Sequence, residues 1–273
     1  MMLQLKNITL SFSGGRGTFK ILDSLNLCVE RGKITALVGG NGTGKTTLFN
    51  IISGFQKDCS GEIVFNDKKI NTLSPSGIAR QGIGRLFQGK SLLPDLTLLE
   101  NMKLHASTLT EFKTPKGLRD ETPFAYLFRS KRQREIENTK EARAIEVLNN
   151  LFGNENKYLE MLHTLGSDFS YGEQRLLSLA GLFMGSYSLL LLDEPTAGVN
   201  PVYIEQIRRI IRQMAGEGKT ILLIEHNMQF VRDIADKVVY LDNGKIQFEG
   251  TATEVLNNQE VKNSYLGVES ITN

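Results

Sequence analysis

Hydrophobic and polar residues alternate along the first part of the chain, in the pattern of half-buried β-strands. Leu3 to Leu10 and Ile21 to Val29 both follow this period of two. Gly61 to Phe65 and Lys69-Ile70 flank the turn residues Asn66-Asp67, and this arrangement predicts a hairpin. We therefore expect the N-terminal part of the chain to be rich in strands.

The pattern becomes helical and more polar in the middle of the chain, from about Leu92 to Leu165. Thr97 to Glu100 has the Thr-x-x-Glu spacing of a capping box that opens a helix. A second helix is predicted from about Lys131 to Phe152, with Gly153 as its C-terminal stop. Thr108 to Ser130, between the two helices, is predicted to be irregular because it combines charge with prolines and a glycine.

Apolar strands alternate with helices in the last part of the chain. Leu189 to Leu192 and Thr220 to Ile224 are short apolar runs, and the helix between them is predicted to begin at the N-cap Asn200. Asn243-Gly244 lies between two further strands and indicates a hairpin. Together with the apolar run Ile34 to Val38, this alternation predicts an α/β fold with a mostly parallel sheet and helices on both faces.

Composition and charge narrow the class of protein. The 273 residues are enough for one large α/β domain or two small ones, and the net charge of +2 does not favour a nucleic-acid partner. Cys28 and Cys59 lack metal-ligand spacing, which fits a reducing cytoplasm. The N-terminus has no signal-peptide core, and no apolar run is long enough to span a bilayer. We expect a soluble protein that reaches a membrane only through a partner.

A glycine-rich turn that follows the apolar run Ile34 to Val38 carries the first chemistry. It fits the pattern G-x-x-x-x-G-K-[ST] between a strand and a helix, which is the context of a phosphate loop. Glycines let the backbone bring several N–H groups onto a phosphate, and the helix N-terminus adds its positive end. Lys45 would reach the β- and γ-phosphates of a nucleotide, and the Thr46 hydroxyl would bind Mg²⁺. The predicted ATP-binding residues of this loop are Gly39, Gly40, Asn41, Gly42, Thr43, Gly44, Lys45, Thr46 and Thr47.

A pair of acids ends the apolar run Leu189 to Leu192. A carboxylate at the C-terminal end of a buried strand lies at the sheet edge where ligands bind. We expect Asp193 to hold the Mg²⁺ shell and Glu194 to polarise the attacking water. Two acids before a proline would by themselves indicate an ordinary turn, and the phosphate loop makes catalysis the favoured interpretation.

A helix start and two single residues complete the set. Ser170 and Glu173 form a capping box, so Ser170 is expected to begin an apolar helix whose start beside Gly172 can bind an anion. Gln88 follows an apparent strand and would reach the metal or the water, and His226 follows Thr220 to Ile224 and would hydrogen-bond the γ-phosphate. Each feature alone is more often structural, but their placement at strand and helix ends favours function.

In this order, the motifs resemble those of the ATP-binding subunits of ABC (ATP-binding cassette) transporters, over the chain from Leu3 to about Gly267. The resemblance implies a P-loop ATPase core with a mostly parallel sheet, an antiparallel β subdomain and a helical subdomain. The corresponding divisions are residues 1–91 (antiparallel β subdomain and phosphate-loop part of the core), 92–168 (helical subdomain), 169–250 (signature helix and the rest of the core) and 251–273 (C-terminal helical tail).

The resemblance also implies a role for each residue. The phosphate loop is the Walker A loop, Asp193 the Walker B acid, Glu194 the catalytic glutamate, His226 the switch histidine and Gln88 the Q-loop residue, which is a further Mg²⁺ ligand. Phe12 would stack on adenine. Phe19 is the alternative, because residues 14–18 resemble a local insertion, and a core-facing aromatic is the other interpretation of Phe12.

The implied mechanism is that of a dimeric ATPase that binds two MgATP between head-to-tail subunits. The signature residues Ser170, Tyr171, Gly172 and Glu173 would complete the site of a second subunit, either another copy or a paralogue. The helical segment would receive a coupling helix of a transmembrane permease. This places the protein on the cytoplasmic face of the inner (plasma) membrane, with no nucleic acid as a partner.

Within the family, the chain is similar to the ATP-binding subunits of branched-chain amino acid importers. The resemblance rests on the Ser-Tyr-Gly signature, on Ala197 to Pro201, on the long segment before the signature and on the ending Ser264 to Gly267. Lipopolysaccharide-export and urea-import subunits share several of these features and stay open as alternatives. A stand-alone ABC ATPase that acts on nucleic acid or ribosomes would usually carry tandem cassettes or a long coiled coil. A regulator that binds ATP without turnover is disfavoured by the intact Glu194 and His226.

Overall fold

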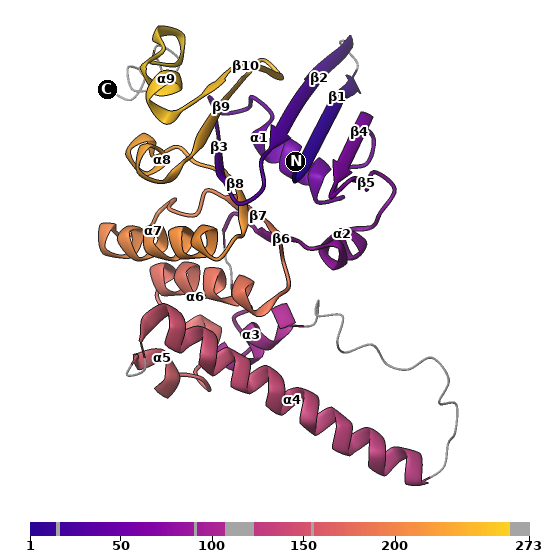
Figure 1. The fold of residues 1–273 in the computed structure, drawn as a ribbon, viewed down its shortest axis with the longest axis vertical. Coiled ribbons are helices and arrows are strands. Elements are labelled where there is room, and N and C mark those ends of the chain that lie inside the picture. The colour runs from indigo at the N-terminus through magenta and orange to yellow at the C-terminus, as the bar shows by residue number, and fades with distance from the viewer. Residues whose placement is uncertain (15–16, 90–91, 107–122, 154–155, 263–273) are drawn as a thin grey trace. The chain divides into compact units, whose positions relative to one another are not determined.

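The computed structural model describes residues 1–14, 17–89, 92–106, 123–153 and 156–262 (Figure 1). Contacts within the chain divide it into two compact units. The first unit comprises Met1–Gly89 and Tyr187–Asn273, and the second comprises Lys90–Ser186. Both termini of the chain therefore belong to the first unit, and the second unit is an insertion in it.

A six-stranded sheet is the main element of the first unit. Its strands lie in the order β10-β9-β3-β8-β7-β6, and the neighbours from β9 to β6 are parallel, whereas β10 runs antiparallel to β9. Strands β3, β7 and β8 are buried at every position, as their apolar runs predict. The bounds are β3 Ile34–Val38, β6 Ile83–Leu86, β7 Leu189–Asp193, β8 Thr220–Ile224, β9 Lys237–Asp242 and β10 Lys245–Gly250.

An antiparallel sheet accompanies it, with the strand order β2-β1-β4-β5. Its strands are β1 Leu3–Gly14, β2 Gly17–Val29, β4 Ser60–Phe65 and β5 Lys68–Lys69. The predicted hairpin at Asn66-Asp67 is confirmed, with φ values of 48° and 60° at the two turn residues. One hydrophobic cluster contains Leu5 of this sheet, Phe49 of helix α1 (Lys45–Ile52) and Leu191 of β7. Helix α1 therefore ties the two sheets into one core.

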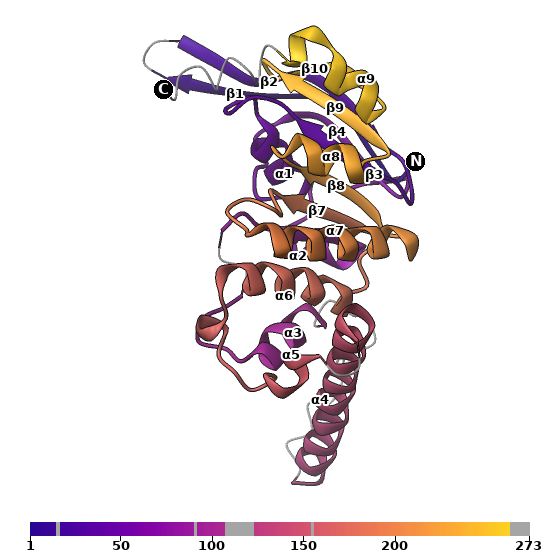
Figure 2. The same ribbon diagram turned by 90° about the vertical axis from the view of Figure 1, so that its left-hand side faces the viewer.

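The described part of the first unit contains four further helices, and each begins at a side-chain cap. The caps are Ser74, Asn200, Asn227 and Thr251, for α2 Pro75–Gln81, α7 Pro201–Gly216, α8 Met228–Ile234 and α9 Ala252–Asn257. Helix α9 packs against β9 and β10, and α8 packs against α9 (Figure 2). The predicted start of α7 at Asn200 is confirmed, because the Asn200 Oδ1 accepts a hydrogen bond from the Val202 N–H at 2.9 Å.

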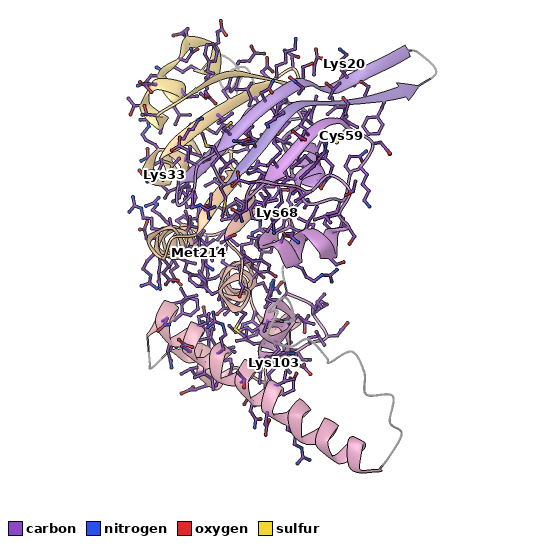
Figure 3. All side chains as sticks on the ribbon, turned by 45° about the vertical axis from the view of Figure 1, so that its right-hand side comes forward. Lys20, Lys33, Cys59, Lys68, Lys103 and Met214 are labelled. Carbon is purple, nitrogen blue, oxygen red and sulfur yellow. The ribbon has the colours of Figure 1, made fainter. Side chains whose placement is uncertain are left out.

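The second unit is helical. It contains α3 Leu98–Ala106, α4 Pro123–Phe152, α5 Lys157–Glu160, a 3₁₀ turn Gly166–Asp168 and α6 Tyr171–Met184. The capping box at the start of α3 is confirmed, because Glu100 accepts hydrogen bonds from the Thr97 N–H and hydroxyl, both at 2.8 Å. Figure 3 labels Lys103 of α3, which pairs with Glu137 and Glu141 of α4 at 3.5 and 3.1 Å.

Two sequence-based boundaries differ in the second unit. Helix α4 begins at Pro123 rather than near Lys131, because a proline fits the first turn of a helix, where no intrahelical N–H is needed. Helix α6 groups with this unit, whereas the division at residues 168/169 had placed it with the core. The reason is that α6 packs against α3 and α4, and Gly181 leaves room for the His105 ring of α3. Residues 107–122 and the ending at 263–273 lie outside the described residues.

The turn between β9 and β10 supplies a test of close packing. Gly244 has φ 72°, and a Cβ at this position would lie 2.5 Å from the carbonyl oxygen of Ile21. Gly218 has a similar φ of 84° with nothing within 4 Å of its Cβ position, which makes it a matched control. Gly218→Ala should cost only the left-handed conformation, about 1 kcal/mol in the free energy of unfolding. Gly244→Ala should cost ~1–3 kcal/mol more because of the clash. Urea denaturation measures both, and equal losses would contradict the packing.

Candidate active site

The predicted phosphate loop joins β3 to α1. Two of its glycines, Gly42 and Gly44, have φ values of 77° and 102° in the left-handed region. A Cβ on Gly39 would lie 2.2 Å from the carbonyl oxygen of Leu241, so only glycine lets the loop approach β9 so closely. Gly44 caps α1 without any side-chain hydrogen bond to the first helical N–H groups. The loop therefore presents backbone N–H groups and the positive end of a helix, which together suit a phosphate.

The ammonium of Lys45 lies against the same loop. Its Nζ donates hydrogen bonds to the carbonyl oxygens of Gly39 and Gly40, at 2.9 and 2.7 Å. The residue is 6% exposed, and this burial lowers the pKa of Lys45, while the carboxylates of Glu194 and Asp193 act in the opposite direction. A buried cation next to a phosphate loop and two carboxylates is the charge arrangement that a triphosphate and a divalent metal require.

Strand β7 carries the two acids to the edge of the sheet. Asp193 is the last residue of the strand and is buried, and its Oδ2 lies 3.2 Å from Nη2 of Arg85. Glu194 follows with φ 47°, a conformation that costs a non-glycine residue roughly 1–3 kcal/mol. The Glu194 N–H donates to the carbonyl oxygen of Ile224 at 3.0 Å, which holds the turn on β8. The turn gives the two adjacent carboxylates separate environments.

Gln88 and His226, which follow two other strands, both contact the Glu194 carboxylate. Gln88 Nε2 donates a hydrogen bond to Oε2 at 2.9 Å, and His226 Nε2 lies 3.1 Å from Oε1. The side chain of Glu194 is 18% exposed and that of His226 is 36% exposed, so water can reach them. The structure therefore brings together the candidate base and the two groups that would orient the attacking water.

Two charged residues of this region, Glu225 and Arg85, are not among the residues predicted from the sequence. Glu225 is buried at the end of β8, and its Oε1 accepts hydrogen bonds from the N–H and hydroxyl of Thr196, at 2.8 and 2.6 Å. Its Oε2 accepts from the N–H groups of His226 and Asn227, at 3.0 and 3.2 Å. Glu225 thus joins the loop after Glu194 to the turn that carries the histidine. A charged residue directly after an apolar strand is the signal that could have found Glu225, and a charged residue within a short strand is the signal for Arg85 in β6.

The signature residues lie in the second unit, at the start of α6. The predicted capping box is confirmed: Glu173 Oε2 accepts from the N–H and hydroxyl of Ser170, at 3.0 and 2.8 Å. Lys157 of α5 pairs with the other oxygen of Glu173. Burial acts to raise the pKa of Glu173, but the hydrogen bonds from Lys157 and Ser170 outweigh it, and the pKa is lowered. The helix start is therefore held rigidly, while Tyr171 stays 41% exposed.

The two candidate adenine-stacking residues face each other across the β1–β2 hairpin. Phe12 pairs with Phe19 in the strand register, and they are 50% and 71% exposed. The core-facing interpretation of Phe12 is therefore wrong. Exposure of both rings leaves each available to a planar ligand, and the stacking role stays a prediction.

Comparison with known proteins identifies the family. The family profile described as "ABC transporter" matches residues 22–197. The chain is 32% identical to a probable branched-chain amino acid transport ATP-binding protein, LivG, of Archaeoglobus fulgidus, over 98% of this chain and 96% of that protein. It is 31% identical to the high-affinity branched-chain amino acid transport ATP-binding protein LivG of Escherichia coli K12, over 97% of this chain and 98% of that protein.

Solved structures agree with this match. A nucleotide-free ATP-binding cassette from an ABC transporter has a TM-score of 0.76 at 29% identity, and covers 97% of this chain and 98% of its own. The ADP conformation of MJ1267, an ATP-binding cassette of an ABC transporter, has a TM-score of 0.75 at 27% identity, over 97% and 98% of the two chains. The chain belongs to the ABC transporter family and has the α/β P-loop ATPase fold. It is an ATP-binding subunit of a transporter, and it hydrolyses ATP.

The part of the chain that the structure describes contains no helix that is both long and apolar enough to cross a bilayer.

The four hydrogen bonds to Glu225 generate a stability prediction. Glu225→Gln keeps the volume but turns one acceptor oxygen into a donor that faces N–H or O–H groups. The free energy of unfolding should fall by ~1–3 kcal/mol per buried group left unsatisfied. Urea denaturation measures the loss. Glu254→Gln is the matched control, since Glu254 completes an exposed capping box that glutamine also completes. A loss no larger than in the control would refute the role of Glu225.

Proposed function

We propose that this chain is the ATP-hydrolysing subunit of a branched-chain amino acid importer, and that it works as a head-to-tail dimer beneath a membrane permease. The cluster in which Gln88 and His226 both contact the Glu194 carboxylate carries the catalytic part of the proposal. The substrate class rests on the similarity to branched-chain amino acid transport ATP-binding proteins. The proposal places the protein on the cytoplasmic face of the inner (plasma) membrane, held there by the permease, with no nucleic acid as a partner.

The phosphate loop would bind the triphosphate through its backbone. The N–H groups of residues 39–47 and the N-terminus of α1 supply neutral donors, and Lys45 supplies a buried positive charge near the β- and γ-phosphates. Phe12 would add a stacking contact to adenine, and Phe19 is the alternative. These residues hold the nucleotide and orient its terminal phosphate.

Three residues of the predicted site offer oxygen donors suited to Mg²⁺. Thr46 at the start of α1, Asp193 at the end of β7 and Gln88 after β6 offer a hydroxyl, a carboxylate and an amide oxygen, and Mg²⁺ usually combines one or two carboxylates with phosphate oxygens and water. These residue types fit the ion, and we propose them as its ligands. Bound Mg²⁺ would neutralise charge on the transferring phosphate.

Glu194 would act as the base for the attacking water. Its carboxylate would take the proton of the water, and Gln88 and His226 would hold that carboxylate and the water in line with the γ-phosphate. The position of Asp193 in the strand, one residue earlier, separates metal binding from base chemistry. In this division of roles, the two adjacent acids would perform different tasks because their partners differ: Asp193 pairs with Arg85, whereas Glu194 contacts Gln88 and His226.

The signature at the start of α6 would act on the nucleotide of a second subunit, either another copy of this chain or a paralogue. Ser170, Tyr171, Gly172 and Glu173 belong to a different compact unit from the phosphate loop, and the rigid cap presents a hydroxyl and helix N–H groups. A γ-phosphate bound between two subunits would join them, and hydrolysis would release them. The permease would couple to this cycle through the helical unit.

Glu194→Gln tests the base. The amide preserves the shape but cannot accept the proton, so steady-state ATPase activity should fall by ~10²–10⁴-fold. ATP binding should be retained, and size-exclusion chromatography with ATP should show a shift to a dimer that cannot hydrolyse its way open. Glu260→Gln, an exposed glutamate outside the cluster, is the matched control. ATPase activity equal to that of the parent would exclude Glu194 as the base.

Mixed dimers test the shared site. Lys45→Ala damages the phosphate loop and Ser170→Arg damages the signature, so each homodimer has two damaged sites, whereas a mixed dimer has one intact site. Partial ATPase activity should return when the two variants are mixed. A mixture of Lys45→Ala with Glu194→Gln is the control, because both changes lie on the same side of the site and leave no intact one. If verified mixed dimers of the first pair stay as inactive as the control, the head-to-tail mechanism is wrong.

A further inference from the structure

We propose that Arg85 is a positioning residue that fixes the Asp193 carboxylate for metal binding, by tying it to the helix that follows the phosphate loop. The inference rests on the proposed function, which makes Asp193 a Mg²⁺ ligand. Arg85 lies in β6, next to β7 in the parallel sheet. The exposed fractions of the two side chains are 6% for Arg85 and 1% for Asp193, and Nη2 lies 3.2 Å from Oδ2.

The guanidinium is held from its other side by α1. Its Nη1 donates hydrogen bonds to the Oδ1 of Asn50 and the Oγ of Ser53, both at 2.8 Å. The Ser53 hydroxyl in turn donates to the carbonyl oxygen of Phe49 at 2.6 Å, which fixes its direction. Helix α1 begins at Lys45, so one planar group connects the phosphate-loop helix to the metal carboxylate.

Aromatic rings cover the guanidinium. The carbon atom of the guanidinium lies 5.7 Å from the ring centroid of Phe49 and 4.6 Å from that of Phe87. Phe87 directly precedes Gln88, whose amide donates to Glu194. Arg85 therefore contacts the segment that carries Gln88 as well as the Walker B acid, and it links three parts of the site that come from different elements.

The geometry requires an arginine rather than any cation. A guanidinium donates from a rigid plane and can bind Asn50, Ser53 and Asp193 in two directions at once. A lysine at this position would present a single point charge on a flexible stem, and could pair with Asp193 without fixing where the carboxylate lies. Charge compensation alone would be kept by lysine, whereas positioning would be lost, and this difference can be measured.

The experiment measures how much Mg²⁺ the protein needs to bind ATP. A fluorescent ATP analogue is titrated in the Glu194→Gln background, where turnover should be ~10²–10⁴-fold slower, first in EDTA and then with increasing Mg²⁺. Partners that orient a metal ligand typically contribute 10–100-fold to metal affinity. We expect Arg85→Lys to raise the Mg²⁺ concentration that gives half-maximal enhancement of analogue binding by about tenfold or more. The affinity for the analogue in EDTA should stay within about twofold of that of the parent, which is well below the tenfold lower limit expected for the metal effect.

Asn50→Ala removes a holder of the guanidinium without touching Asp193. It should shift the Mg²⁺ requirement in the same direction when Arg85 is present, and it should add nothing in an Arg85→Met background. Arg80→Lys, at an exposed arginine at the end of α2, is the matched control and should leave the requirement unchanged. Thermal unfolding of each variant establishes that it is folded. If Arg85→Met does not fold, Arg85→Lys and Asn50→Ala decide the matter alone.

Asp193→Asn separates the two hypotheses. One outcome is that Asp193→Asn raises the Mg²⁺ requirement, whereas Arg85→Lys and Asn50→Ala change it by no more than about twofold, less than a positioning partner should. Arg85 then only forms a structural ion pair with Asp193. The inference is then overturned, and the metal role of Asp193 stands. If Asp193→Asn itself leaves the requirement unchanged, the proposed metal site fails, and the role of Arg85 is overturned with it. A shift in all three variants, with unchanged affinity in EDTA, supports both.

Discussion

A carboxylate buried at the end of an apolar strand needs a compensating charge, and the first unit is organised around this requirement at Asp193. The strand that carries it is buried at every position, so solvation by bulk water is lost. Arg85 supplies the charge from the next strand, and Lys45 supplies a second positive charge from the start of α1. The parallel sheet, the phosphate-loop helix and the acid are therefore held together electrostatically as well as by the hydrophobic core.

The site also uses backbone conformations that ordinary sequence positions avoid. Left-handed glycines form the phosphate loop, and Glu194 adopts a positive φ at a cost that the surrounding structure must offset. Its N–H is fixed on β8, and Glu225 anchors the two flanking loops through four hydrogen bonds. The strained Glu194 is thus flanked by loops that a buried carboxylate, Glu225, holds in place. Under the proposed function, this arrangement would preorganise Glu194 as the base before substrate binds.

The second unit follows a different principle. Its helices pack through buried apolar side chains, with ion pairs between α3 and α4 at the surface, and the start of α6 is fixed by Ser170, Glu173 and Lys157. Exposed ion pairs contribute little to stability, typically about 0–1 kcal/mol. The main effect of the Lys157–Glu173 pair is therefore to fix the conformation of the first turn of α6. A rigid signature on a separate unit suits a group that acts on a nucleotide held by another chain.

The sequence by itself determined the elements and the motifs. The apolar runs predicted the bounds of β3 and β8 to the residue, because a strand that is buried on both faces is apolar along nearly its whole length. The capping boxes at Thr97 and Ser170 were predicted from the local spacing of Ser or Thr and Glu. The tertiary structure decided what local spacing cannot encode. Side-chain packing groups α6 with the helical unit. The tertiary structure also leaves the Phe12 ring exposed to solvent. It also brought Arg85 to Asp193 and Glu225 to Thr196, two pairs that are distant in sequence and meet only because neighbouring parallel strands carry them to one region of the sheet.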